Sequence, residues 1–237
     1  MAWRVIVPNT VSLAAMTAGF FSIIAAVNFD IVRSAYFIML AMLLDGLDGN
    51  LARWLNGVTD FGAELDSYVD LTAYGIAPAV LIYQFSPASE TTAAFLAVLT
   101  ALFGVIRLAR FKALDEFRGQ KGYTGLPITM SAGWIAFSSF LYETSPLMFF
   151  KSSPLMPPLF VFGLVVCLLL QVSNFKYPKP TKNPFCFSGC AGLILLCLLP
   201  YQVINQPAAA LLIMLGAGYV VSGFIPSKTG TSSNFSS

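Results

Sequence analysis

The sequence contains no histidine and has few charged residues of either sign. Only 10% of its 237 residues are charged, against about 25% in an average soluble domain, and 57% are hydrophobic. This balance argues against a soluble domain. The 13 Lys and Arg residues nearly balance the 11 Asp and Glu residues, and the chain has no basic tail. We therefore expect no nucleic-acid partner.

Cysteine is also scarce. The four cysteines, Cys167, Cys186, Cys190 and Cys197, all lie in apolar runs, and no C-x-x-C pair occurs. Without histidine to complete a ligand set, they do not predict a zinc site. Small residues packed inside lipid-embedded helices are the simpler interpretation.

Long apolar runs dominate the rest of the chain. Crossing a bilayer takes about 20 mostly apolar residues. Eight runs approach or reach that length: 10–28, 34–55, 62–85, 91–112, 125–142, 155–173, 184–200 and 207–225. The first has no clear small-residue cleavage site, so we expect it to be retained rather than removed as a signal peptide. The sequence predicts an all-α integral membrane protein with about eight transmembrane helices.

The Lys and Arg residues predict its orientation. With the amino terminus in the cytoplasm, eleven of them fall on the cytoplasmic side and two, Arg33 and Lys151, on the other. The eleven are Arg4, Arg53, Arg107, Arg110, Lys112, Arg118, Lys121, Lys176, Lys179, Lys182 and Lys228. This asymmetry favours an even number of spans. We expect a bacterial plasma (inner) membrane, with the acidic stretch described next facing the cytoplasm.

Four carboxylates, those of Asp45, Asp48, Asp66 and Asp70, lie in the second and third runs. Ionisable groups at membrane depth are costly and mark functional sites by default. The i, i+3 and i, i+4 spacings put each pair on one helical face. Four neighbouring acids either take up protons or hold metal. Oxygen ligands without histidine indicate a hard cation such as Mg²⁺, Mn²⁺ or Ca²⁺. An ion pathway in a transporter is the alternative from a different functional class.

The complete pattern is Asp45-x2-Asp48-Gly49-x2-Ala52-Arg53-x8-Gly62-x3-Asp66-x3-Asp70. It resembles the signature of the CDP-alcohol phosphatidyltransferase family of membrane enzymes at every fixed position. The resemblance implies a six-helix core that transfers a phosphatidyl group from a CDP-linked lipid to an alcohol and releases CMP. It also implies two divalent cations held by the four Asp residues, with Asp70 acting as general base.

The same resemblance implies that Gly49, Ala52 and Arg53 lie against the nucleotide, and we add Gly62 to this group. The residue chemistry agrees. Gly49 lets a ligand approach the helix backbone, and the Arg53 guanidinium, one turn later, suits phosphate oxygens. Asn9 is a further candidate for the nucleotide, or else it caps the helix that follows it. Asp60 is expected to cap the third helix.

Stretches outside the signature resemble the phosphatidylserine synthase branch of the family. They are Asp66-Ser67, Tyr74-Gly75-Ile76-Ala77-Pro78, Arg107-Leu108-Ala109-Arg110-Phe111 and Gly125-Leu126-Pro127. That branch usually has Phe at the position of Tyr74 and Asn at that of Lys112. The resemblance implies CDP-diacylglycerol as donor and L-serine as acceptor. Inositol, inositol phosphate or glycerol 3-phosphate as acceptor, and an archaeal ether-lipid donor, stay open.

Arg107, Arg110 and Lys121 are candidates for binding the acceptor, since the carboxylate of serine needs a cation. Their alternative role is to anchor the chain on anionic lipid headgroups. We divide the chain into a membrane core at 1–173, two further transmembrane helices at 174–226 and a disordered tail at 227–237. The family resemblance also suggests a homodimer.

Overall fold

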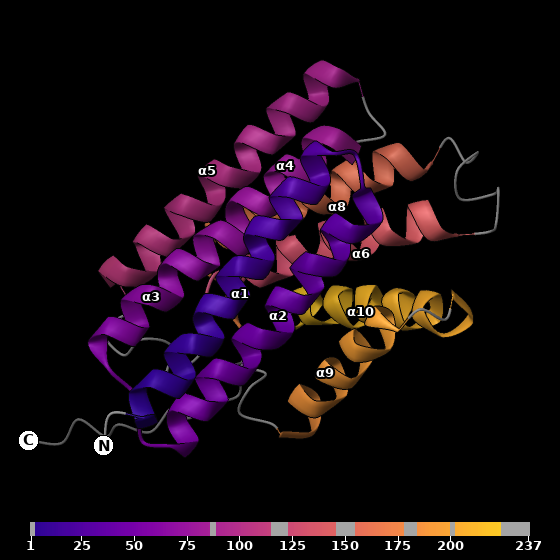
Figure 1. Ribbon diagram of the computed structural model, residues 1–237. Helices are drawn as coiled ribbons and strands as arrows, with labels where there is room; N and C mark the ends of the chain where they lie inside the picture. Colours follow the sequence, from indigo (N-terminus) through magenta and orange to yellow (C-terminus); the bar gives the residue numbers. More distant parts are fainter. Residues whose placement is uncertain are drawn as a thin grey trace, which may run out of the picture.

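The computed structural model describes residues 3–85, 89–114, 123–145, 155–177, 184–199 and 202–223. Within them lie eight helical segments (Figure 1). Seven are α1 (Trp3–Val27), α2 (Ile31–Trp54), α5 (Glu90–Leu114), α6 (Ile128–Thr144), α8 (Met156–Gln171), α9 (Pro184–Leu198) and α10 (Gln202–Ser222). The other is continuous through α3 (Asp60–Asp70), the π-helical η1 (Leu71–Ile76) and α4 (Ala77–Phe85). Each of the eight predicted apolar runs coincides with one of these segments.

The helices α1 and α2 form an antiparallel hairpin that carries half of the acidic stretch. They pack closely because small residues, among them Ala15, Ala26 and Ala35, are fully buried. At the turn, the side chain of Asp30 accepts a hydrogen bond of 3.0 Å from the backbone N–H of Arg33 and so caps α2. The hairpin brings the start of α1 and the end of α2 to the same end of the molecule.

The start of α1 differs from the prediction. The helix begins at Trp3, so Asn9 lies inside it and the capping alternative for Asn9 is wrong. Pro8 also lies inside the helix, where its missing N–H frees the carbonyl of Arg4. Gly57, in the turn after α2, packs against that carbonyl so closely that any side chain would collide with it. The α2–α3 turn thus covers the first turns of α1.

The third helical segment carries the other half of the acidic stretch. Thr59, not Asp60, caps it, since the Thr59 hydroxyl accepts a hydrogen bond of 3.0 Å from the N–H of Gly62. The sequence prediction for Asp60 was therefore wrong by one residue. Within the segment, η1 follows Asp70 directly and contributes the fully buried Ala73 and Tyr74 to the core. Single π-helical turns inside α-helices occur frequently at functional sites.

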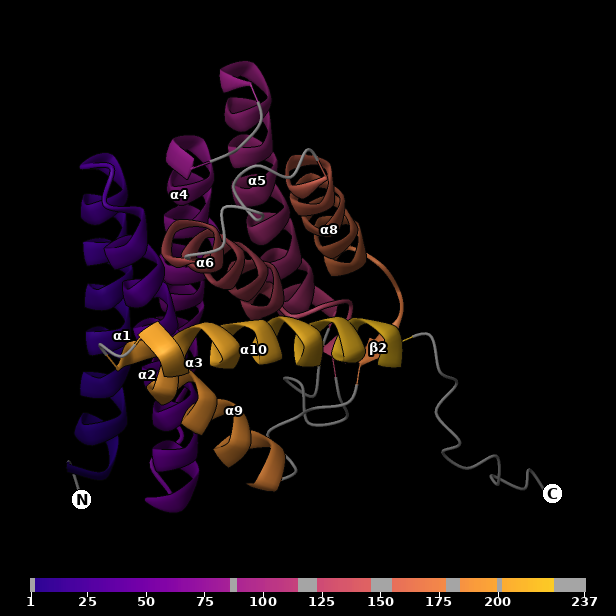
Figure 2. The same cartoon turned by 90° about the vertical axis from the view of Figure 1, so that its right-hand side faces the viewer.

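The carboxyl-terminal half packs against this core through contacts of α6 and α9 with α2 and of α8 with α5. Strands β1 (Tyr123–Thr124) and β2 (Lys176–Tyr177) pair antiparallel and join the start of α6 to the end of α8. In both views α10 runs across the long axes of α1 and α5 rather than along them (Figures 1 and 2). The prediction that 174–226 supplies two further membrane-crossing helices stays a prediction. The proposed disordered tail at 227–237 lies outside the described residues.

The outer faces of α1 and α5 are apolar. Among the described residues, these two helices are long and apolar enough to cross a membrane, with mean hydropathies of 1.9 and 2.0. Large side chains such as Phe20, Phe95 and Leu102 are more than half exposed on them. Exposed apolar side chains gathered on a helix face are typical of a surface that contacts lipid or another protein. Contact with lipid explains these faces.

Candidate metal centre and active site

Three of the four predicted acids meet between α2 and α3. Asp45, Asp48 and Asp66 each offer a carboxylate oxygen, and these oxygens all lie within 4.8 Å of one another. Asp48 is buried, Asp45 is half-buried and Asp66 is exposed, so the cluster opens on the side of Asp66. Asp70 lies one turn beyond Asp66, within electrostatic reach of the other three carboxylates. The helical spacing read from the sequence therefore assembles the expected group.

The geometry of this triad fits a hard cation. Two oxygens bound to one Mg²⁺ or Ca²⁺ at about 2.0–2.6 Å lie at most about 5 Å apart, and the triad meets this condition. The donors are carboxylate oxygens from two neighbouring helices, which is the ligand chemistry such ions prefer. Closely placed carboxylates also repel one another unless a cation lies between them. The residues present thus fit a divalent metal.

Helix α1 contributes a residue that sequence reasoning missed. The hydroxyl of Ser12 donates a hydrogen bond of 2.5 Å to Oδ2 of Asp48. Both side chains are buried, each with 5% exposure. The pair links α1 to the acidic face of α2. A serine carries no charge, and nothing in its spacing marked it. The available signal was its place one turn after Asn9, on the helix already expected to line the site.

Arg107, on α5, lies beside Asp70, the last of the four acids. Its Nη1 lies 3.8 Å from Oδ2 of Asp70, and the residue is only 7% exposed. Its guanidinium carbon also lies 5.3 Å from the ring centre of Phe111, within cation–π range. A buried guanidinium beside the last carboxylate partly compensates the negative charge of the cluster. This places the sequence-predicted Arg107 on the wall of the site.

Arg110, the second predicted acceptor-binding residue, makes its contacts at the end of another helix. The guanidinium of Arg110 donates hydrogen bonds to the carbonyls of Val172 and Ser173 and to the side-chain oxygen of Asn174. It caps the carboxyl end of α8, as basic side chains at helix ends commonly do. Lys121 lies outside the described residues.

The pair formed by Lys112 and Glu64 lies on the outer surface of the same region. The Lys112 ammonium lies 2.6 Å from a carboxylate oxygen of Glu64 and 5.6 Å from the ring centre of Tyr68. The Glu64 side chain is 58% exposed, and Glu64 is not one of the three acids of the triad. The Lys112 charge that distinguishes this chain from the resembled branch is therefore used between α3 and α5.

The predicted nucleotide-binding residues lie along both helices of the site. A Cβ on Gly49 would meet the guanidinium nitrogens of Arg53 at 3.7 and 3.9 Å, so Arg53 lies over the bare backbone at Gly49. The same guanidinium donates to the Asn50 side chain at 2.7 Å. Ala52 is half-buried one turn after Asp48. On the facing helix, a Cβ on Gly62 would lie 3.1 Å from Oδ1 of Asn9.

A buried hydroxyl lies beside the acids without a hydrogen-bond partner among the described residues. It belongs to Tyr74 in η1, whose side chain is fully buried and within electrostatic reach of all four carboxylates. An unsatisfied buried hydroxyl costs about 1–3 kcal/mol. A polar group bound at the acidic cluster would relieve this cost. The orphan hydroxyl is therefore a second observation, besides the oxygen triad, that fits a bound ligand.

Comparison with known proteins agrees with this geometry. A family model described as CDP-alcohol phosphatidyltransferase matches residues 5–170, which include α1 and all four acids. The match covers more than half of the chain. The chain belongs to the CDP-alcohol phosphatidyltransferase family. Members of this family are embedded in membranes, which agrees with the apolar faces of α1 and α5, and we describe the chain as a membrane protein.

Several relatives are named for a reaction that makes a serine phospholipid. CDP-diacylglycerol–serine O-phosphatidyltransferase of Helicobacter pylori is 28% identical over 92% of this chain and 89% of its own length. The enzyme of the same name from Methanocaldococcus jannaschii is 32% identical over 82% and 84%. Archaetidylserine synthase of Methanothermobacter thermautotrophicus is 30% identical over 73% and 69%. Serine thus recurs in these names, while the lipid differs.

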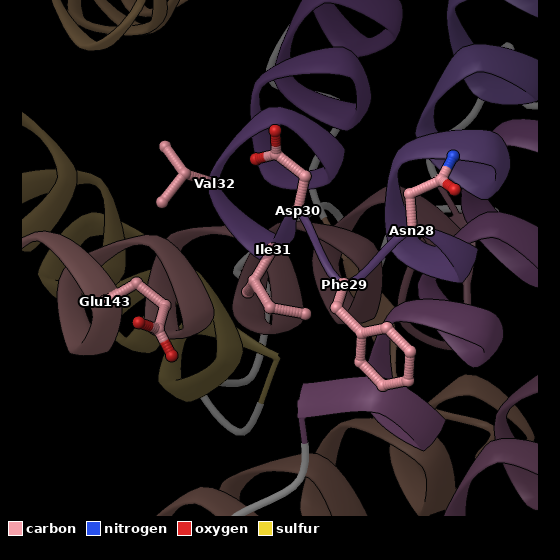
Figure 3. Close-up of a pocket in the computed structure, with 6 residues that line it drawn as sticks. All are labelled: Asn28, Phe29, Asp30, Ile31, Val32 and Glu143. Atoms are coloured by element: carbon pink, nitrogen blue, oxygen red, sulfur yellow. The ribbon is translucent and has the colours of Figure 1, made fainter.

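This phosphatidyltransferase family member also has a hollow at the far end of its α1–α2 hairpin. It is lined by Asn28, Phe29, Asp30, Ile31, Val32 and Glu143 and measures about 380 Å³ (Figure 3). Its two acids are Asp30, the N-cap residue of α2, and Glu143 of α6. Asp30 is paired with Arg33 at 3.2 Å. The hollow lies at the opposite end of the hairpin from the oxygen triad, so it is not part of that site.

Proposed function

We propose that the chain transfers the phosphatidyl group of CDP-diacylglycerol to the hydroxyl of L-serine, giving phosphatidylserine and CMP. The oxygen triad of Asp45, Asp48 and Asp66 carries the reaction class, since it is built to hold cations against a diphosphate. The names of the relatives support serine as acceptor. The buried Arg107 adds a cation of the kind that a serine carboxylate needs.

We further propose that the triad and Asp70 together hold two divalent cations, Mg²⁺ or Mn²⁺, with Ca²⁺ also suited to the oxygen ligands. When bound, such a pair neutralises the charge on the diphosphate and on the leaving CMP. The opening on the side of Asp66 gives a diphosphate access to the cluster. Gly49, Ala52 and Arg53 on α2, with Gly62 and Asn9 opposite, would line the nucleotide.

Asp70 and Arg107 act on the serine acceptor in this proposal. In the proposed reaction the serine oxygen forms a bond to the lipid-side phosphorus while the bond from that phosphorus to the bridging oxygen breaks. CMP leaves with the bridging oxygen, and Asp70 takes the hydroxyl proton. Arg107, 3.8 Å from Asp70, would hold the serine carboxylate beside this base. Positioning and charge compensation supply most of the catalysis in such transfers.

The membrane arrangement is part of the proposal. Arg4, Arg53 and Arg107 lie at the same end of the α1, α2 and α5 helices as the acids, and Arg33 lies at the other end, which supports a cytoplasmic site. The family match over 5–170 supports a six-helix core at 1–173, followed by two helices at 174–226. A bacterial plasma membrane and a homodimer complete the proposal.

An acceptor competition tests this function. Purified protein with CDP-diacylglycerol, Mn²⁺ or Mg²⁺ and equal concentrations of labelled serine, inositol and glycerol 3-phosphate should place label from serine in lipid. CMP should appear in equal amount, and Asp70→Asn should stop both products. Label from inositol or glycerol 3-phosphate alone would make the acceptor wrong and leave the reaction class standing. No CMP from any acceptor would favour the transporter alternative.

A CDP-linked ether lipid is the alternative donor, because one relative is named for the synthesis of archaetidylserine. The same assay with a CDP-linked ether lipid in place of CDP-diacylglycerol decides between the two lipids. The proposal expects the diacyl donor to give the higher kcat/KM.

A further inference from the structure

A buried hydrogen bond joins Ser12 of α1 to Asp48, one of the candidate metal ligands, and can hold that carboxylate in place. Asp48 is the buried member of the oxygen triad, and its Oδ2 accepts a hydrogen bond of 2.5 Å from the hydroxyl of Ser12. A carboxylate turns freely about its last bond unless one of its oxygens is held. Because Ser12 is itself buried in the α1–α2 interface, it can hold that oxygen from a fixed point.

A second contact restrains the serine. Its Oγ lies 3.2 Å from the carbonyl oxygen of Pro8, one turn earlier in α1. The hydroxyl has a single proton, which it donates in the shorter contact, to the carboxylate of Asp48. The Pro8 carbonyl then limits the positions that Oγ can adopt. The chain Pro8–Ser12–Asp48 thus runs from the first turns of α1, which the α2–α3 turn covers, into the acidic cluster.

We propose that Ser12 is a positioning residue for the metal ligand Asp48 and sets the affinity of the site for its cation. This inference rests on the proposed function for its cation, and it adds a residue from a helix that holds none of the four acids. Hydrogen bonds to metal-binding side chains orient them, and losing one typically weakens metal binding about 10–100-fold. Ser12 touches neither substrate nor metal in this proposal, so it acts through Asp48.

The same helix pair offers a matched control. Ser22 in α1 is also buried, and its hydroxyl lies 2.9 Å from the hydroxyl of Ser34 and 3.0 Å from the Ser34 carbonyl in α2. It lies ten residues from Ser12, about 15 Å along the helix. Ser22→Ala therefore removes an equally buried hydroxyl from the same interface at a distance from the acids. Loss of packing alone predicts the same result for both variants.

The experiment measures Mn²⁺ binding to the full chain in detergent by electron paramagnetic resonance of the free ion. Ser12→Ala should weaken Mn²⁺ binding about tenfold or more. Ser22→Ala should bind Mn²⁺ as the unaltered protein does, and Ser12→Thr, which keeps the hydroxyl, should restore most of the affinity. In serine transfer, Ser12→Ala should need correspondingly more Mn²⁺ for half-maximal rate and recover most of its kcat at saturation.

Several outcomes overturn the inference. They are unchanged Mn²⁺ affinity in Ser12→Ala, equal weakening in Ser12→Ala and Ser22→Ala, or a loss of kcat that Mn²⁺ does not restore. If Ser12→Ala does not fold, Ser12→Cys, with its weaker S–H donor, replaces it and should bind Mn²⁺ with intermediate affinity. Failure of the proposed function looks different: the unaltered protein would bind Mn²⁺, with the Ser12 effect intact, and yet leave serine unincorporated.

Discussion

The two ends of the α1–α2 hairpin use the same kind of residue for different purposes. At one end the buried Ser22 and Ser34 satisfy each other's hydroxyls. At the other end the buried Ser12 meets the carboxylate of Asp48, which belongs to a group of acids. A neutral pair is complete by itself, whereas a buried carboxylate among others still lacks compensating charge. The first contact closes an interface, and the second prepares a site.

The acids at the two ends repeat this contrast. Asp30 caps α2 and pairs with the neighbouring Arg33, and its side chain is 36% exposed. Water and the neighbouring Arg33 guanidinium are sufficient to compensate the charge of the Asp30 carboxylate. Asp45, Asp48 and Asp66 instead converge from two helices, with Asp70 beside them against the buried Arg107. Convergence of carboxylates, rather than their presence near a membrane, is what distinguishes a candidate metal centre from a helix cap.

The strongest way to break this comparison is to remove an acid from each end. Asp66→Ala should lower phosphatidyl transfer about a thousandfold, the loss seen when a preorganised charge-stabilising group is removed. Asp30→Asn, which keeps a capping side chain, should change the rate less than about twofold. Initial rates with CDP-diacylglycerol and serine measure both. Membrane insertion should be unchanged in each variant, and equal losses of rate would remove the distinction between the two ends.

Adding metal should sharpen the comparison through stability. A cation that binds only the folded protein stabilises it by about 2.7 kcal/mol at a hundredfold excess over its Kd. Mn²⁺ should therefore raise the Tm of the unaltered protein and of Asp30→Asn, but not that of Asp66→Ala. Thermal unfolding followed by tryptophan fluorescence, with and without EDTA, gives the result. A Tm rise in Asp66→Ala equal to that of the unaltered protein would move the metal away from the triad.

Two arginines on α5 extend the comparison to a single helix. Arg107 faces Asp70, while Arg110, one turn later, caps the end of α8. Arg107→Ala should raise the KM for serine roughly thirtyfold, which corresponds to a loss of about 2 kcal/mol in binding free energy. The reason is that the substitution removes one partner of a desolvated charge pair. Arg110→Ala should lower the Tm and leave that KM nearly unchanged. The reverse pattern in KM would show that Arg110, and not Arg107, contacts the acceptor.

Spacing predicted well that Asp45, Asp48 and Asp66 can meet, because the direction of a side chain on a helix depends on local geometry. Asp45 and Asp48 share one helical face, and Asp66 and Asp70 share another, wherever the helices pack. Apolar length likewise located the eight helical segments within the described residues. What the sequence did not reveal depends on contacts distant in the chain, such as Arg110 with residues 172–174, or on neutral groups such as Ser12.

Helix ends were harder to predict for a different reason. Pro8-Asn9 has the composition of a helix start, yet α1 begins at Trp3, because the α2–α3 turn packs on the carbonyl that Pro8 leaves free. The π-helical turn after Asp70 had no signal in hydropathy, since its residues are as apolar as those of α4, which follows it. Both features place side chains of the site, and both are decided by tertiary packing.

The smallest expected effect concerns the orphan hydroxyl of Tyr74, and its sign should depend on whether the site is loaded. In the protein without ligand, Tyr74→Phe removes an unsatisfied buried polar atom and should raise the Tm. With Mn²⁺ and a CDP-linked lipid bound, the hydroxyl is expected to gain a partner worth about 1 kcal/mol, so Tyr74→Phe should lose about fivefold in kcat/KM. Thermal unfolding with EDTA and with saturating ligand, together with initial rates, measures both halves.

Tyr177→Phe is the control for this prediction, because that buried tyrosine lies in β2 and its hydroxyl faces the Val220 carbonyl at 3.5 Å, away from the acids. It should change neither the rate nor the difference in Tm between loaded and unloaded protein. A Tm that rises equally in Tyr74→Phe with and without ligand would mean that nothing bound at the acids reaches the hydroxyl. The orphan atom would then belong with the neutral interface at the far end of the hairpin, as a packing feature, and the site would end at the four acids.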